Sequence, residues 1–138
     1  MPELKLTSTP PAEDLVRLAD NLTRFNESDV GPSGKLPIAA LLHEGETLLA
    51  GLSGYTAWGW LYVQWLWIAE AHRGRGMAGQ LLAKAEAEAL TRGCHGAYID
   101  TFNPHALRVY QKAGYTVFGT LADFPPGRTR SFLRKTLG

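Results

Sequence analysis

The chain has 138 residues, of which 45% are hydrophobic and 20% are charged, and its formal net charge is +1. This length predicts one domain, and the composition is that of a globular protein. No apolar run reaches the roughly 18–20 residues of a membrane-spanning helix, and the near-neutral charge argues against a nucleic-acid partner. Cys94 is the only cysteine, which excludes a disulfide framework and predicts a reducing, cytoplasmic location.

The charged residues are unevenly distributed along the chain. Residues 1–70 carry 4 Lys/Arg against 9 Asp/Glu, whereas residues 71–138 carry 10 against 4. A basic second half favours an anionic ligand bound there, although solvated surface charges alone would produce the same imbalance.

The spacing of apolar residues predicts the secondary structure. Leu4 and Leu6 alternate with polar neighbours as a short strand would, helical spacing follows over residues 12–25, and residues 26–37 are expected to form a loop. Further helices are predicted over 77–91 and 104–113, the second with Asn103 as its N-cap. Strands are predicted over residues 38–43, 47–55, 58–68, 97–102, 116–121 and 131–137.

The predicted order is β-α-β-β-β-α-β-α-β-β, a single-domain α/β fold around one mixed central sheet. Residues 60–102 form a strand, loop, helix and strand in succession. The two strands of this unit should therefore be parallel, with a right-handed crossover between them.

A glycine-rich turn between a predicted strand and a predicted helix carries the most chemical information. Gly74, Gly76 and Gly79 remove side chains there, so backbone N–H groups can point into one concavity. The helix that follows adds the positive end of its dipole, and Arg73 and Arg75 add forked donors. This combination indicates a phosphate or pyrophosphate site.

A dinucleotide site is one alternative reading of this turn. Its glycine spacing matches the dinucleotide fingerprint, and Asp100 lies about where a ribose-binding acid should be. Against this reading, residues 69–73 separate the strand from the first glycine, and the chain has no space for a second nucleotide-binding half. A glycine-rich loop without any ligand is the other alternative.

Two motifs in this half of the chain resemble those of one family. The turn contains Arg73-x-x-Gly76-x-Ala78, and residues 103–115 read Asn-x-x-Ala-x-x-x-Tyr-x-Lys-x-Gly-Tyr. Both resemble signatures of the GCN5-related N-acetyltransferase (GNAT) family, in the expected order and separated by one helix and one strand. The predicted element order is also similar to that of the family.

The resemblance implies that residues 1–138 form an N-acetyltransferase domain. Such a domain transfers the acetyl group of acetyl-CoA to a primary amine by direct attack on the thioester, without a metal. It further implies a strand that becomes irregular over residues 66–69 and splays from its neighbour, so that the cofactor enters the gap. The implied cofactor contacts are Leu66, Ile68, Arg73, Gly74, Arg75, Gly76, Met77, Ala78, Gly79, Gln80, Asn103 and Lys112.

Tyr110 is the catalytic residue that the resemblance implies, as the general acid toward the departing thiolate. A phenol with a pKa near ~10 stays protonated at neutral pH and can donate to a thiolate whose conjugate acid has a pKa of ~8.5. The alternative is a tyrosine that only packs in the core. For Lys112, a phosphate contact and a solvated helix cation are equally open, and the helix-capping role of Asn103 is compatible with a cofactor contact.

The general base stays unassigned at this level. Strict alternation places Tyr62 and Gln64 on the same strand face as Leu66 and Ile68. It places both Trp65 and Trp67 on the other face. None of these side chains is a base at neutral pH. Tyr62 and Gln64 are therefore candidates for binding the acceptor. Acids and a histidine elsewhere could substitute as the base, namely His43, Glu44, Glu46 and Asp100.

The expected partner is a small-molecule or peptide amine, and a second subunit could cover one face of the tryptophan-rich strand. A non-catalytic module that senses acyl-CoA or docks a partner is an alternative. It is motivated by the lack of a carboxylate on the strand before the glycine-rich turn, where a general base would be expected. An acetyltransferase toxin that modifies charged tRNA is a third reading, and the weak basic excess argues against it.

Overall fold

The computed structural model describes all 138 residues, and the chain divides into two compact units, Met1–Ser33 and Gly34–Gly138. The first unit contains α1 (Ala12–Val30), a helix that buries none of its side chains. It extends five residues past the predicted end at Phe25, and there the Ser28 hydroxyl donates to the Phe25 carbonyl at 2.7 Å. None of the helices of the protein is both long and apolar enough to span a bilayer.

The strand expected around Leu4 and Leu6 is absent, because residues 1–11 pair with no other strand. Local alternation creates a strand only where another strand satisfies its backbone groups. The remaining elements follow the predicted order.

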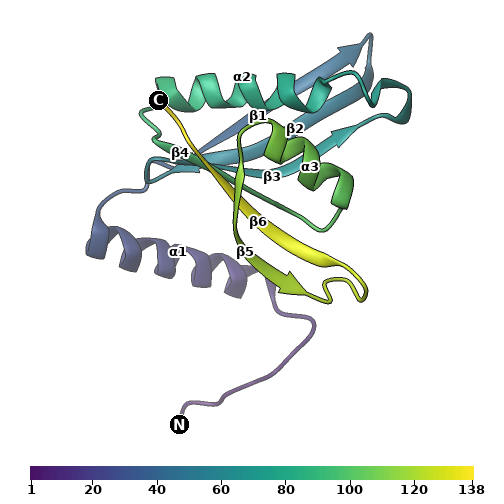
Figure 1. Ribbon diagram of the computed structural model, residues 1–138. Coiled ribbons are helices and arrows are strands. Elements are labelled where there is room, and N and C mark those ends of the chain that lie inside the picture. Colours follow the sequence, from purple (N-terminus) through teal and green to yellow (C-terminus); the bar gives the residue numbers. More distant parts are fainter. The chain divides into compact units, whose positions relative to one another are not determined.

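The second unit contains one six-stranded sheet and two α-helices (Figure 1). The strand order is β1-β2-β3-β4-β6-β5, which leaves β1 and β5 at the edges. The strands are β1 (Leu36–Glu44), β2 (Thr47–Ala57), β3 (Trp60–Ile68), β4 (Gly96–Thr101), β5 (Thr116–Ala122) and β6 (Thr129–Thr136). The helices are α2 (Met77–Thr91) and α3 (Pro104–Lys112), and a short 3-10 turn, η1 (Glu70–His72), precedes α2.

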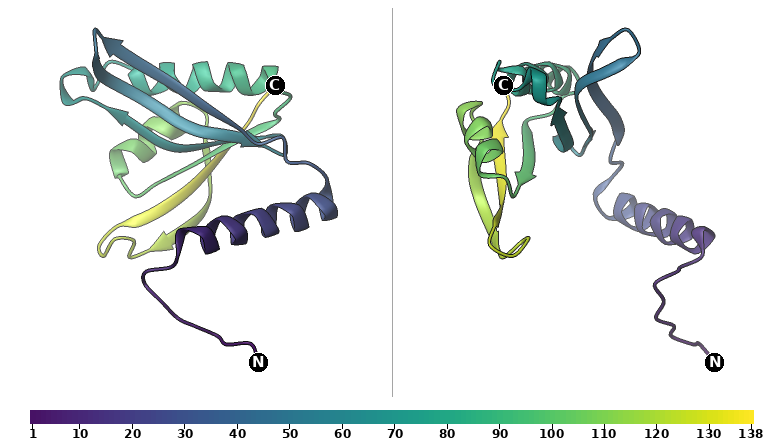
Figure 2. Two further views of the ribbon diagram at one scale, coloured as in Figure 1. Left: turned by 180° about the vertical axis from the view of Figure 1, so that it is seen from behind. Right: turned by 90° about the vertical axis from the view of Figure 1, so that its right-hand side faces the viewer.

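The pair β3 and β4 is parallel, as predicted for two strands joined through a helix, and the other four neighbouring pairs are antiparallel. The connecting helix α2 runs along the sheet and packs on β1, β2 and β3, whereas α3 contacts β4 and α2 (Figure 2). The core between the sheet and the helices buries Leu52, Leu61, Val63, Leu82 and Leu133 most completely.

The strands β3 and β4 separate before either of them ends. Their last paired residues are Val63 and Ile99, yet β3 continues to Ile68 alongside β2 and β4 continues to Thr101 alongside β6. The sheet therefore opens along its centre, and backbone groups at this opening have no partner strand. This confirms the expected splay of the tryptophan-rich strand. The irregularity expected over residues 66–69 is absent, because residues 66–68 pair regularly with β2.

A β-bulge lies immediately beyond this point and corrects the predicted face assignment. Ser53 pairs with Trp65 but Gly54 pairs with Val63, which leaves Gln64 as the extra residue on β3. Because the bulge shifts the alternation by one, Leu66 joins the core face and lies opposite Leu52. Strict alternation over residues 62–68 was thus wrong, and Tyr62 lies on the face opposite to Leu66.

Candidate functional site

The turn between β3 and α2 is shaped to expose backbone donors. Gly74 and Gly76 adopt φ angles of 75° and 73°, in the left-handed region that favours glycine. Gly76 is the N-cap of α2 and supplies no side-chain cap, so the N–H groups of the first turn have no intrahelical partner. These donors and the helix dipole together favour an anion beside the turn.

Gly79 lies in the first turn of α2 and carries no side chain that would fill the space beside it. Its φ is ordinary, and a Cβ placed on it would meet no atom within 4 Å. Glycine in a helix costs about 1 kcal/mol relative to alanine, and no neighbour within the chain requires its small size here. The missing side chain instead keeps the space beside the first turn of α2 open.

Gln80 was predicted to offer its backbone N–H to the cofactor. This N–H instead donates to the Gly76 carbonyl at 3.2 Å within the helix. The donors free for an anion therefore end before Gln80. The side chain of Gln80 borders a different groove, between β1 and α2, and Arg75 lines neither groove.

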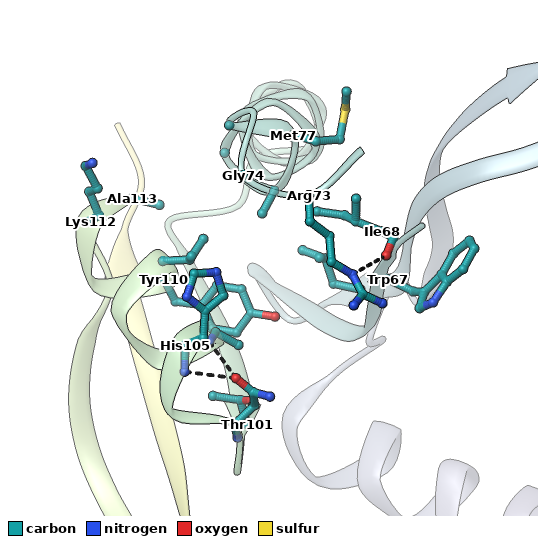
Figure 3. Close-up of a pocket in the computed structure, with 17 residues that line it drawn as sticks. Trp67, Ile68, Arg73, Gly74, Met77, Thr101, His105, Tyr110, Lys112 and Ala113 are labelled. Atoms are coloured by element: carbon teal, nitrogen blue, oxygen red, sulfur yellow. Dashed lines mark hydrogen bonds between the residues drawn. The ribbon is translucent and has the colours of Figure 1, made fainter. Parts of the chain in front are cut away.

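A cleft of about 740 Å³ opens where β3 and β4 separate (Figure 3). Three segments line it: the end of β3, the glycine turn with the start of α2, and α3 with the residues before it. The lining residues are Leu66, Trp67, Ile68, Arg73, Gly74, Gly76, Met77, Ala78, Gly79, Thr101, Asn103, His105, Ala106, Val109, Tyr110, Lys112 and Ala113. Ten of the twelve predicted cofactor contacts and the predicted catalytic tyrosine are thus brought together.

Asn103 occupies the N-cap of α3, as predicted. Its side-chain oxygen accepts from the backbone N–H groups of His105 at 2.9 Å and Ala106 at 3.0 Å (Figure 3). Because the oxygen is used for capping, the amide nitrogen is left as a donor at the edge of the cleft. Across the cleft, Arg73 Nε donates to the Ile68 carbonyl at 2.9 Å, which ties the turn to the end of β3.

Tyr110 projects from α3 toward the cleft and is 6% exposed. Its hydroxyl makes no hydrogen bond within the chain, and no buried side-chain polar atom lacks a partner, so the hydroxyl reaches the open space of the cleft. Burial, with a smaller contribution from the Asp100 carboxylate, raises the pKa of Tyr110 to about 12. This phenol therefore holds its proton throughout the neutral range.

The two predicted acceptor-binding residues do not line the cleft. Gln64 is the exposed bulge residue of β3, and Tyr62 lies on the sheet face opposite to Leu66, where its hydroxyl donates to Asp100 at 3.3 Å. Of the four groups considered as bases, His43, Glu44 and Glu46 lie at the β1–β2 turn. Only Asp100 lies close enough to influence Tyr110.

Sequence reasoning missed most of the α3 side of the cleft. Ala106, Val109 and Ala113 line it together with Tyr110, and Thr101 and His105 extend this side toward β4. The spacing of Ala106, Val109, Tyr110 and Ala113 is that of one helix face, and this signal was available in the sequence. The place of Thr101 in the cleft could not be predicted from local spacing, because it follows from the separation of β4 from β3 in the sheet.

Comparison with known proteins agrees with this geometry. The family model of the acetyltransferase (GNAT) family matches residues 6–115. The chain is 47% identical over 127 residues to an acetyltransferase of Agrobacterium fabrum, covering 90% of each protein. It is 40% identical over 91 residues to the blasticidin-S acetyltransferase of Streptomyces morookaense, covering 65% of this chain and 67% of that protein.

Solved structures show the same fold. A crystal structure of an acetyltransferase from Agrobacterium tumefaciens superposes with a TM-score of 0.93 at 41% sequence identity, covering 98% of this chain and 99% of that one. The similarity therefore extends over nearly the whole length of both chains.

Proposed function

Because the chain belongs to the acetyltransferase (GNAT) family, we propose that it transfers the acetyl group of acetyl-CoA to a primary amine by direct attack on the thioester. The observation that carries this proposal is the cleft itself. One cavity joins the unpaired end of β3, a turn with free backbone donors and the hydroxyl-bearing side of α3. Bound acetyl-CoA would supply the acetyl group as an activated thioester.

The residues around the cleft fit a long cofactor with an anionic end. The first-turn N–H groups of α2 and the guanidinium of Arg73 would bind the pyrophosphate, since both favour anions. The open space beside Gly79 allows phosphate oxygens to approach the backbone. Leu66 and Ile68 would offer backbone groups to the pantetheine arm, and Asn103 and Lys112 would add polar contacts from α3.

Tyr110 is the proposed general acid. Its hydroxyl is in the cleft and holds its proton at neutral pH, with a pKa of about 12. It is therefore available as a proton donor to the departing thiolate. The transfer is uphill, because a thiol has a lower pKa of about 8.5, so the phenoxide that forms recovers its proton from water in the cleft. The cleft lining contains no carboxylate, so no residue of the lining is proposed as the base.

The acceptor is proposed to be the primary amine of a small molecule or peptide. The name of the Streptomyces relative, a blasticidin-S acetyltransferase, favours a small molecule. The single cysteine, buried and without a disulfide, supports a reducing compartment such as the cytoplasm.

The test is thiol release from acetyl-CoA in the presence of blasticidin S, spermidine or a peptide with a free alanyl N-terminus. Calorimetry with CoA measures cofactor binding separately. Gly79→Glu places a carboxylate in the open space beside the first turn of α2 and should abolish CoA binding. Gly119→Glu on the edge strand β5, where a Cβ would also meet nothing within 4 Å, is the matched control and should bind normally. Equal affinity in both variants would contradict the assignment of the turn.

A further inference from the structure

The sheet face opposite to the cleft contains a carboxylate at the point where β3 and β4 separate. Asp100 is the first residue of β4 after the last pair, Val63 and Ile99. Because side chains alternate along a strand, Asp100 points away from the core face that holds Ile99. It shares the opposite face with Tyr62 on the neighbouring strand, whose hydroxyl it contacts.

The Asp100 carboxylate is held in one orientation. Its Oδ1 accepts from Arg130 Nε at 3.0 Å and from Arg130 Nη2 at 2.8 Å. The guanidinium of Arg130 lies over the rings of Phe124 at 4.8 Å and Phe132 at 5.1 Å. Both strong bonds fall on Oδ1, so Oδ2 has only the 3.3 Å contact from Tyr62 and can accept a further hydrogen bond.

This carboxylate is also close to the reaction centre proposed above. Asp100 raises the pKa of Tyr110, second only to burial, although the two side chains come from different faces of the sheet. Thr101, the next residue of β4, lines the cleft, and no strand pairing joins β3 to β4 beyond Val63 and Ile99. Asp100 therefore lies at the edge of the opening that forms the cleft, with its side chain on the opposite face of the sheet.

The segments that adjoin Asp100 carry exposed aromatic rings. Trp65 is 68% exposed, and the bulge at Gln64 turns it to the side of Tyr62. Phe102 follows the end of β4 and is 46% exposed, and its ring centroid lies 6.5 Å from that of Phe124, the ring that the Arg130 guanidinium covers. Such rings provide apolar and π-electron surface that favours a cation or a flat group.

We propose that Asp100 Oδ2 and the Tyr62 hydroxyl oxygen bind the acceptor amine, and that the acceptor is a small cationic amine with an apolar or planar group packed on Trp65 and Phe102. This inference rests on the proposed function. An ammonium group has three N–H donors, and two of them would meet these two oxygens. Arg130 already balances the charge of Asp100, so recognition depends on hydrogen-bond geometry at short range and not on net charge.

The first test is Asp100→Asn, assayed with the panel amine that the unmodified protein acetylates fastest. We expect kcat/KM for the amine to fall about tenfold or more, mainly through KM, because a charge-assisted hydrogen bond is lost. The affinity for CoA should not change, because Asp100 does not line the cleft. Asp123→Asn is the matched control, since this residue lies in the β5–β6 turn at a φ of 57° that asparagine also adopts.

Tyr62→Phe tests the same site with less risk to folding. It removes only the hydroxyl and keeps the ring, which stacks on Tyr98 with centroids 4.7 Å apart. We expect a several-fold increase in the amine KM, with CoA affinity unchanged. Full kcat/KM for the amine in both folded variants would overturn the inference and leave the acetyltransferase reaction intact. Lack of turnover of every amine by the unmodified protein would contradict the proposed function, and this inference with it.

Discussion

Lys135 Nζ on β6 donates to Glu86 Oε1 on α2 at 2.7 Å, which joins the end of the sheet to the helix that follows the glycine turn. Glu86 is buried, and its other oxygen accepts from the Tyr115 hydroxyl at 2.8 Å. Lys135 also donates to the Ala113 carbonyl at the end of α3 at 2.9 Å. The network therefore holds in place the two helices that border the cleft.

Replacement of Glu86 by alanine should destabilise the fold. It would leave the Lys135 ammonium and the Tyr115 hydroxyl without their acceptor, at a cost of about 2–3 kcal/mol in the free energy of unfolding. Glu88→Ala is the control on the same helix, because Glu88 is 49% exposed and pairs with Arg92 at the surface. That change should cost less than about 1 kcal/mol. Urea unfolding at neutral pH measures both, and equal costs would contradict the structural role of Glu86.

Gly79→Ala should change stability and cofactor affinity in opposite directions. The residue lies in α2 with an ordinary φ and open space around it, so alanine should stabilise the helix by about 0.5–1 kcal/mol. The added methyl group should also weaken CoA binding, because it enters the space kept for the phosphates. Thermal unfolding and calorimetry with CoA test the two effects. A stabilised variant with full CoA affinity would show that this space is not used.

Two substitutions of Asn103 should separate its role as the cap of α3 from its role as a cofactor contact. Asn103→Ala removes the cap of α3 and should cost about 1 kcal/mol of stability. Asn103→Asp keeps a capping oxygen and should preserve stability, but it removes the amide donor and adds a negative charge beside the cleft. We expect about tenfold weaker CoA binding in Asn103→Asp. Unchanged affinity in that variant would limit Asn103 to the capping role.

Tyr110→Phe should reduce turnover far more than cofactor affinity. General acids contribute on the order of 10²–10⁴ in rate, so kcat should fall about 100-fold or more while the Kd for CoA stays within about twofold. Stability should change little, since the hydroxyl makes no hydrogen bond within the chain. Steady-state kinetics on the acetylated amine measures the effect, and full activity would remove Tyr110 from the mechanism.

The stability of the fold should decrease at alkaline pH. Burial raises the pKa of both Tyr98 and Tyr110 to about 12 in the folded protein, above the ordinary value of 10.0. A raised folded-state pKa means that the unfolded chain loses these protons first, so stability is complete below pH 10 and is lost as pH rises toward 12. The urea concentration at the unfolding midpoint should be highest at pH 8, lower at pH 10 and lowest at pH 11.5. Tyr98→Phe should make the decline shallower, and a flat series would contradict the burial of these phenols.

Much of the cleft could be predicted from local patterns. The positions of Gly74 and Gly76 before a helix and of Asn103 before Pro104 depend on backbone conformation and capping within a few residues, and the structure has both where they were predicted. The face of α3 that includes Tyr110 also follows from helix spacing. The family motifs fall on these same local features.

Tertiary structure decided which face of the sheet each side chain of β3 occupies and which residues lie beside it. The bulge at Gln64 arises from the register between β3 and β2, and no pattern within β3 marked it, so Tyr62 and Leu66 were placed on one face although they lie on opposite faces. The strand expected at Leu4 and Leu6 failed for the same reason, because strands require partners distant in sequence.

The sequence by itself determined the order of the elements from α1 onward, the anion-favouring turn and the tyrosine of α3, since each follows from interactions among residues close in the chain. Only the tertiary structure decided that β3 and β4 part after Val63 and Ile99, and that Asp100 meets Tyr62 and Arg130 there. Those contacts join residues about 30 or more positions apart. Strand register and the packing of the sheet create them, and neither is encoded in a local pattern.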